Sequence, residues 1–267
     1  IDIWKKVVMD YEKSGDRLGS GKARNRLMEC LIDRFEVEKD WSNRKAIFTE
    51  GLGHGEKAIA NLSEIDDYEL ARAYYLTARL YFFAAYYGEL EKKKELGETS
   101  LTYLERALEL SEKTGDEHLI AMSNLATIYS QFWLTGDLKL STKLAEKILQ
   151  HGLKMKDNLL IGQAFSWMAG ITYWVPWAKE DPDEKRGMYE KTIEYTRQAT
   201  SYFDKISSYV FVGETHWPLV ESLALIAYEV ETDLGQKRVL LKRAIEAGRR
   251  AREVVDEFGH PPDSAAF

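Results

Sequence analysis

The chain has 267 residues, of which 30% are charged and 45% are apolar, and 37 Lys and Arg against 44 Asp and Glu give a formal charge of −7. This composition excludes a mainly disordered chain, and the net acidity argues against nonspecific binding to DNA or anionic membranes as the main activity. A single cysteine, Cys30, excludes a disulfide framework and a multi-cysteine zinc site, and it suits a reducing, cytoplasmic compartment.

No targeting or membrane segment is evident in the sequence. The chain begins at Ile1 without a charged segment followed by an apolar one, so no secretory signal is visible. The uncharged run 158–178 has the length of a transmembrane helix, but polar residues such as Gln163 and Ser166 interrupt it. The run 119–136 is similar, and two such runs favour helices sandwiched within a soluble stack over a membrane span.

Apolar residues recur at intervals of three and four, and strand-like alternation is nearly absent, which predicts an all-α protein. Gly15-Asp16, Gly115-Asp116 and Gly136-Asp137 each combine a helix-ending glycine with a helix-starting aspartate. From Gly115 to Gly136 is 21 residues, and from Gly136 to Asp157 is another 21. A pair of helices therefore occupies about 42 residues, which is a repeat period.

This period predicts a leading helix followed by helical hairpins along the chain. Asp181-Pro182-Asp183-Glu184 is the clearest boundary, because it combines an N-cap, a proline at the first helical position and an acidic first turn. The leading helix covers 1–13, and the hairpins pair 20–36 with 44–61, 68–88 with 98–113, 117–134 with 138–154, 158–177 with 184–204, and 215–234 with 236–257.

The two helices of each predicted pair differ in character. The first helix is apolar and aromatic around most of its girth, whereas the second is amphipathic with a charged outer face. A helix that is apolar all round must be covered on several sides, and an amphipathic helix only along one stripe. A curved stack of two helical layers meets both requirements. We expect it to form one domain over residues 1–258. Residues 259–267 then form a linker or the start of a truncated further repeat.

Three stretches carry a family resemblance. They are Leu125-Ala126 with Tyr129 and then Ala145, residues 71–81 followed by Leu104 and Ala107, and Met168-Ala169 with Tyr173. This pattern resembles the tetratricopeptide repeat (TPR) over about residues 44–258. The period near 42 exceeds the usual 34, so the chain looks like the long-repeat variety of sensor or scaffold regions in larger regulators. The resemblance implies a right-handed superhelical solenoid of antiparallel helix hairpins, about five of them plus an N-terminal helix.

Motifs that suggest enzymes or metal sites have structural interpretations. Asp66-Asp67 is interpreted as a helix start rather than a metal-diphosphate motif. The histidines are scattered without the spacing of a metal site. Gly51, Gly53 and Gly55 are interpreted as small residues that allow close helix packing rather than as a phosphate loop. We therefore expect no catalytic residues, no cofactor and no metal.

Aligning the helices by the TPR pattern predicts which side chains line a concave groove. Arg72 and Arg79 lie seven residues apart and share a helix face, and a charge in so apolar a helix needs a neighbouring carboxylate or an acidic ligand group. Of these two, an ion pair within the protein is preferred. The predicted groove residues are Arg72, Tyr75, Arg79, Phe82, Asn124, Thr127, Gln131, Gln163, Trp167, Tyr173 and Trp174.

The predicted function is a noncatalytic scaffold module that binds a protein or peptide segment in this aromatic-lined groove, because aromatic residues and arginines dominate protein-binding hot spots. The alternative is a sensory or transport-associated module that encloses a small apolar or amphipathic ligand. No nucleic acid is expected as a partner.

The last predicted helix is basic, with Lys237, Arg238, Lys242, Arg243 and Arg249 among its residues. A solvated outer face is the first interpretation, and a docking surface for an acidic segment or nucleic acid is the second. The end of the stack formed by 217–230 and 241–255 is expected to be partly apolar, so self-association through the last hairpin is a further expectation.

Overall fold

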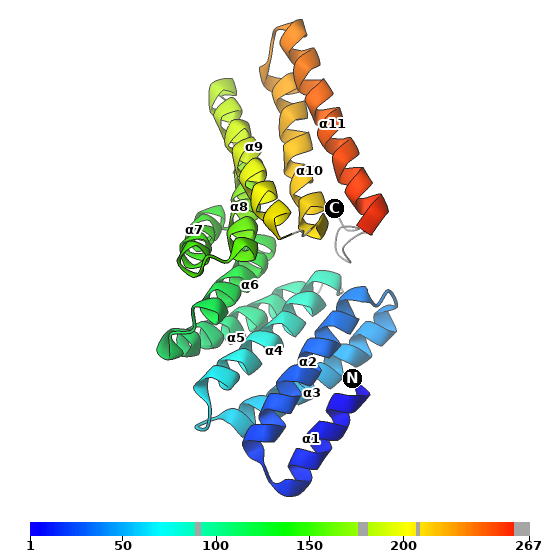
Figure 1. The fold of residues 1–267 in the computed structure, drawn as a ribbon, viewed down its shortest axis with the longest axis vertical. Helices are drawn as coiled ribbons and strands as arrows, with labels where there is room; N and C mark the ends of the chain where they lie inside the picture. Colours follow the sequence, from blue (N-terminus) through cyan, green and yellow to red (C-terminus); the bar gives the residue numbers. More distant parts are fainter. Residues whose placement is uncertain (89–91, 176–180, 207–208, 259–267) are drawn as a thin grey trace. The chain divides into compact units, whose positions relative to one another are not determined.

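The computed structural model describes residues 1–88, 92–175, 181–206 and 209–258, and within them the chain is all-α, as predicted. The helices are labelled in Figure 1. They are α1 (Asp2–Ser14), α2 (Arg17–Val37), α3 (Trp41–Leu62), α4 (Asp67–Tyr87), α5 (Lys93–Thr114), α6 (Glu117–Thr135), α7 (Leu138–Met155), α8 (Asn158–Trp174), α9 (Pro182–Lys205), α10 (Tyr209–Leu225), the π-helical η3 (Ile226–Val230) and α11 (Leu234–Phe258).

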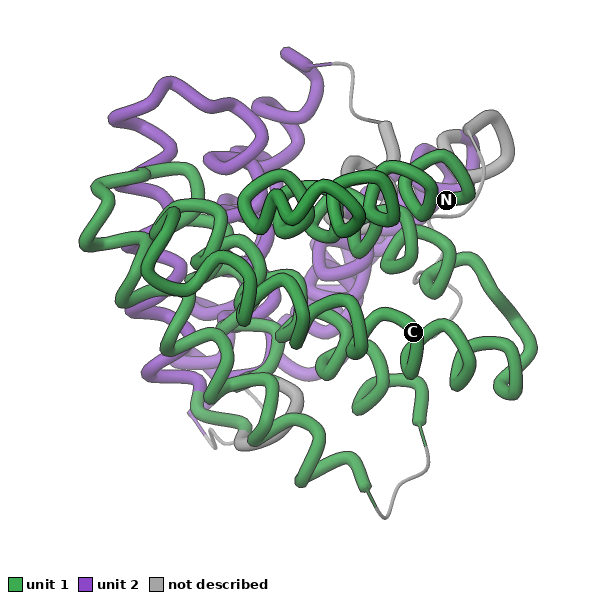
Figure 2. The backbone as a smooth tube through the Cα atoms, turned by 90° about the horizontal axis from the view of Figure 1, so that it is seen from below, with its two compact units in different colours: residues 1–137 green, residues 138–267 purple. Residues whose placement is uncertain are grey.

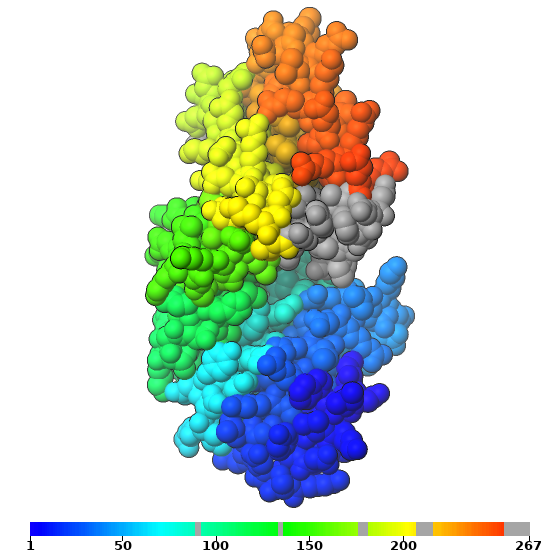
Figure 3. All heavy atoms as spheres, viewed as in Figure 1, coloured from blue at the N-terminus to red at the C-terminus, as the bar shows by residue number. Residues whose placement is uncertain are grey.

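The chain divides into two compact units, residues 1–137 and 138–267 (Figure 2). In the first unit each helix from α1 to α6 packs against the next one in sequence, and in the second unit the same holds from α7 to α11. Within each unit, stretches that follow one another in the sequence border one another on the visible surface (Figure 3). The fold is an all-α solenoid of tandem helices.

The predicted helix order is confirmed, with two differences of detail. The unit boundary at Asp137 falls inside the third predicted hairpin, so α6 and α7 belong to different units. Helix α10 begins at Tyr209, six residues before the predicted start at 215, and contains Pro218 in its interior. The end of the predicted helix 158–177 and the predicted tail over 259–267 lie outside the described residues, and a single domain over 1–258 stays a prediction.

The helix boundaries form where the sequence predicts them. Asp16 accepts a hydrogen bond from the Gly19 amide at 2.8 Å, and Asp116 accepts one from the Leu119 amide at 2.7 Å. Gly15 and Gly115 have φ of 73° and 70°, which is the left-handed conformation that ends helices. Asp181 caps α9 by accepting from the Asp183 amide at 2.8 Å.

The two predicted types of helix differ in burial as expected. In α4, a first helix, 11 residues are buried, whereas in the amphipathic α5 the number is 6. Helix α4 packs against α2, α3, α5 and α6, which together cover most of its circumference. Its buried Leu76 and Leu80 join Leu27 and Leu31 of α2 in the core of the first unit.

Two of the three closely spaced glycines in α3 let it approach α4, as predicted. A Cβ atom at Gly51 would lie 2.6 Å from Cδ1 of Leu80, and one at Gly55 would overlap the Oγ1 atom of Thr77. Thr77 is fully buried and donates its hydroxyl hydrogen to the Ala73 carbonyl at 2.8 Å, so it has little room to move. At Gly53 no atom lies within 4 Å of the added position.

The different surroundings of Gly55 and Gly53 predict opposite effects on stability for alanine substitutions at the two positions. Gly55→Ala is expected to lower the free energy of unfolding by about 1–3 kcal/mol, because the new methyl group overpacks the α3–α4 contact. Gly53→Ala serves as the control, and it is expected to raise stability by roughly 0.4–1 kcal/mol through reduced chain entropy. Urea unfolding followed by circular dichroism measures both. Equal effects of the two substitutions would contradict the packing described here.

Candidate partner-binding surface

Charged residues follow one stripe of α2 and face a matching stripe of α4. Lys22, Arg26, Glu29 and Glu36 recur on α2 at intervals that keep them on one side of the helix. On α4, Arg72 and Arg79 are two turns apart, and α2 packs directly against α4. We call this surface of the first unit the α2/α4 face.

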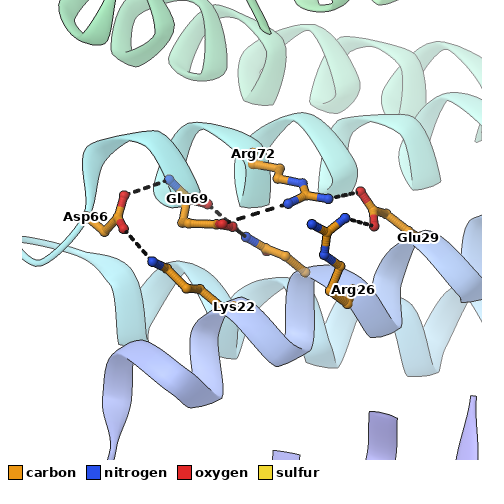
Figure 4. A network of polar contacts seen from close by, with 7 residues as sticks. Lys22, Arg26, Glu29, Asp66, Glu69 and Arg72 are labelled. Carbon is orange, nitrogen blue, oxygen red and sulfur yellow. Dashed lines mark hydrogen bonds and ion pairs between the residues drawn. The ribbon is translucent and has the colours of Figure 1, made fainter. Parts of the chain in front are cut away.

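The α2/α4 face is held by a chain of ion pairs, most of which Figure 4 shows. Lys22 Nζ lies 3.1 Å from Asp66 Oδ2, and Arg26 lies 3.2 Å from Glu29. Arg72 contacts the other Glu29 oxygen and lies 3.8 Å from Glu69.

Arg79, outside that view, lies 2.7 Å from Glu36 on the same face. Each of the two predicted arginines thus has a carboxylate partner on α2. The preferred interpretation, an ion pair within the protein, is confirmed.

Sequence reasoning missed the partners of these arginines, although a signal was present. Glu29 and Arg72 are 43 residues apart, and so are Glu36 and Arg79. That separation is about one repeat period, so searching for opposite charges at this offset would have identified the pairs. Asn25, fully buried in α2, was also missed, and its amide donates to the Glu69 carbonyl at 2.9 Å and to the Glu69 carboxylate at 2.8 Å.

Of the two predicted groove aromatics in α4, the structure leaves one at the surface. The half-buried Phe82 ring lies 5.9 Å from the Tyr86 ring and 5.8 Å from the Tyr129 ring of α6. Tyr75, in contrast, is only 8% exposed and belongs to the core of the first unit. Burial raises the pKa of its hydroxyl. Tyr75 therefore packs between helices rather than lining an open groove, because its position in α4 turns it toward α2.

The three polar residues predicted on α6 do not join Phe82. Asn124 is 1% exposed and donates its amide to the Ile120 carbonyl of its own helix at 2.9 Å. Thr127 donates its hydroxyl hydrogen to the Ser123 carbonyl at 2.8 Å. Gln131 is half-buried. Tyr129, which contacts Phe82, lies about 160–200° around the helix from Thr127 and Gln131, so these two occupy the opposite side of α6.

In the second unit, α8 carries an aromatic surface. Gln163, Trp167, Gly170 and Trp174 follow one another at intervals of four, three and four, so they share one side of the helix. Trp174 is 45% exposed, and no atom lies within 4 Å of the position a Cβ would take at Gly170. We call these four residues the α8 surface.

Tyr173 lies beside this surface but serves a structural contact. It is 5% exposed, and its hydroxyl donates to a carboxylate oxygen of Glu221 on α10. Burial raises the pKa of the Glu221 carboxyl. The Trp174 ring stands edge-on against the Tyr173 ring at 5.3 Å. The structure thus buries Tyr75, Asn124 and Tyr173 among the predicted groove residues, and it keeps Trp167 and Trp174 together.

A second polar cluster joins α1, α2 and α3 around the buried Arg24, which is 2% exposed. Arg24 contacts Glu12 of α1, and its Nη1 donates to Nδ1 of His54 at 2.6 Å. Because a guanidinium has no acceptor, His54 must present an unprotonated Nδ1. Burial and the Arg24 charge lower the pKa of His54. Nε2 of His54 lies 4.0 Å from Glu50, which is itself paired with Lys5 at 2.6 Å.

Among the described residues, no group of three or more His, Cys, Asp and Glu side chains is arranged to hold a metal ion. No helix in the described ranges has the length and apolar character needed to cross a membrane.

Comparison with known proteins gives a distant structural similarity. No protein-family model and no curated protein sequence matches the chain. Among solved structures, the chain is similar to one described as a circular tandem repeat protein with novel repeat topology and enhanced subunit contact surfaces. That alignment has 14% identity and a TM-score of 0.38, and it covers 96% of this chain. The chain spans 65% of the length of that protein.

The contact between Arg24 and His54 predicts a pH dependence of stability. Because the folded pKa of His54 is lowered, the unfolded chain binds the proton first as pH falls below the ordinary imidazole value of about 6.5. The free energy of unfolding is therefore expected to fall with pH below that value, by at most about 1.4 kcal/mol per pH unit from this group. The decline continues until the folded imidazole protonates as well.

His54→Gln tests this prediction, since an amide oxygen can still accept from Arg24 and does not titrate. Chemical unfolding at a series of pH values from 8 to 5 is expected to show a steeper loss of stability in the wild type than in this variant. Parallel curves for the two proteins would show that His54 does not hold a lowered pKa.

Proposed function

We propose that the chain is a noncatalytic helical-repeat module of the long-repeat TPR type, which binds a protein or peptide segment. The all-α solenoid supports a binding role in general, and the recurrence of cross-helix pairs at 43 residues supports a repeat of this length. A fold alone names no partner, so the proposal depends on particular surfaces. We place it in a reducing, cytoplasmic compartment, in keeping with the single cysteine.

The α8 surface is the observation that carries the proposal. Trp167 and Trp174 stand two turns apart on either side of Gly170, where the surface is open. A glycine between two indoles leaves space for an apolar side chain of a partner, whose burial between the rings would remove apolar area from water. Tryptophan is also among the residues most enriched in protein-binding hot spots.

The neighbouring contacts make this surface rigid before a partner binds. Tyr173, next to Trp174, is bonded to Glu221 and so ties the end of α8 to α10. A surface that is already ordered loses less conformational entropy on binding.

In the first unit, Phe82 offers a half-buried ring beside Tyr129 of α6 as a further contact of the proposed binding module. Arg72 and Arg79 would orient a partner by donating hydrogen bonds to it, in addition to their contacts with carboxylates of α2. Thr127, Gln131 and Gln163 stay as proposed contacts of the same kind.

A larger side chain at Gly170 tests directly whether a partner binds at the α8 surface. Gly170→Leu is expected to weaken the binding of a peptide selected on the wild-type chain from a displayed library by about tenfold or more, because the leucine occupies the partner's place. Gly187→Leu is the matched control, since Gly187 is an exposed helical glycine on α9 that also has no atom within 4 Å of its added Cβ. Fluorescence polarisation measures affinity, and circular dichroism checks that both variants fold.

Removing the Trp174 side chain is a second test of the α8 surface. Trp174→Ala is expected to reduce affinity about 30-fold, the size of a hot-spot effect near 2 kcal/mol. Arg106→Ala is the control, because its exposed pair with Glu109 lies on the amphipathic α5. Unchanged affinity in Trp174→Ala would remove the α8 surface from the binding site. A small molecule that copurifies in native mass spectrometry, and that Trp174→Ala releases, would favour the sensory alternative.

A further inference from the structure

Helix α11 carries two apolar stripes, and its contacts within the second unit use only one of them. Leu240 and Ala244 pack against Leu223 and Ile226 in the core of this unit. In the described residues, the elements that pack substantially against α11 are α10 and η3, both on that side. Figure 1 shows α11 at the edge of its unit, beside α10.

The second stripe lies beside the packed side of α11, with Leu241 half-buried at its inner edge. Leu234, Leu241 and Ile245 follow at intervals of seven and four, which places them within about 40° of one another and about 60–100° around the helix from Ala244. Leu234 is 80% exposed and Ile245 is 55% exposed. Intervals of seven and four are typical of a seam that contacts another helix.

Basic side chains border the second stripe. Arg238, Lys242 and Arg249 are exposed and lie on the same side of α11 as Ile245. In the described part of the chain, none of these three takes part in a recorded ion pair or hydrogen bond. Glu246 and Glu253 follow Lys242 and Arg249 at an interval of four, so each carboxylate lies one turn from a cation of the border. Arg250, farther around the helix, is 3.9 Å from Asp204 of α9.

Three carboxylates outside α11 do not neutralise this border, because they have other partners. Glu221 accepts from Tyr173, Glu229 lies 3.2 Å from Lys185, and Glu231 lies 3.0 Å from Arg186. These partners belong to α8 and α9. The second stripe therefore combines an apolar centre with a border on which three cations outnumber two carboxylates, in a chain whose formal charge is −7.

We propose that this stripe of α11 is a docking surface for an acidic amphipathic helix of another protein. Leucine-type side chains of the partner would pack along Leu234, Leu241 and Ile245, and carboxylates on its flanks would face Arg238, Lys242 and Arg249. The stretch from Leu234 to Arg249 is about 22 Å long, which matches about four turns of a partner helix.

The charges along the stripe favour an acidic helix over a second copy of the chain and over a nucleic acid. In a symmetric contact with a second copy, the same basic border would face itself, and like charges repel. A nucleic acid would satisfy the cations but would leave the apolar centre against phosphate and sugar. An acidic helix with an apolar side complements both parts of the stripe.

The test uses a fluorescein-labelled peptide of about three heptads, with leucine at the first and fourth positions and glutamate beside them. The full chain is expected to bind this peptide, and to bind a version with lysine in place of glutamate at least about tenfold more weakly. Raising the salt concentration is expected to weaken binding, because exposed charges are screened.

Two pairs of matched variants locate the surface. Arg238→Glu with Arg249→Glu is expected to lower affinity at least about tenfold, whereas Arg243→Glu with Arg250→Glu changes the net charge equally on the opposite side and is expected to change it less than about threefold. Ile245→Asp is expected to abolish binding, and Val239→Asp, at a 50% exposed position on the other side, is expected to preserve it. Circular dichroism checks the fold of all four.

Several results would overturn the proposal. They are failure of the wild-type chain to bind the peptide, equal losses in the test and control variants, and preferential binding of a DNA or RNA oligonucleotide that the Arg238 and Arg249 variant loses. Concentration-dependent association in sedimentation experiments that Ile245→Asp abolishes would assign the stripe to a second copy instead.

Discussion

The fold depends on covering helices that are apolar around most of their circumference. Helix α4 shows the constraint most clearly, because it packs against α2, α3, α5 and α6 and has 11 buried residues. Such a helix cannot be stable with one neighbour, since the uncovered sides would expose apolar area to water. Stacking hairpins solves this for α4 by giving it neighbours from the preceding and following hairpins. The close approach at Gly51 and Gly55 is one result of that crowding.

Burial of the first helices also determines how polar side chains are used. A charge or amide that is removed from water must be paired, and here the partners lie about one repeat away. Asn25 with Glu69, Glu29 with Arg72 and Glu36 with Arg79 join α2 to α4 in this way. In the second unit, Lys185 pairs with Glu229 and Arg186 with Glu231 at similar separations. These polar contacts connect adjacent repeats.

Because so many charges connect repeats, the surfaces that we propose for recognition use side chains outside these ion pairs. On α8 they are Trp167 and Trp174 beside the open position at Gly170. On α11 they are the outward stripe around Ile245 and the basic residues along it. Both surfaces lie on helices that are packed along another side within the same unit. The two surfaces also differ in chemistry, since one is aromatic and the other is apolar with positive charge.

The sequence by itself determined the helices, their order and their two types. Local signals suffice for this: Asp16 and Asp116 cap the helices that follow them, Gly15 and Gly115 end the helices before them, and the three and four residue periodicity identifies the apolar sides. The sequence also determined that Arg72 and Arg79 share a helix face, because residues seven apart always do so. It determined that both need carboxylate partners, because burying an unpaired charge is costly whichever helices lie next to it.

Only the tertiary structure decided which aromatic and polar residues are open to a partner. Tyr75 and Phe82 belong to the same helix face, yet Tyr75 is buried against α2 and Phe82 is half-buried beside Tyr129. Tyr173 and Trp174 are adjacent in sequence, but one is bonded to Glu221 and the other is 45% exposed. A helix that is apolar on every side has no polar face to indicate its orientation. The exposure of each residue therefore depends on the packing of neighbouring helices, which local periodicity does not encode.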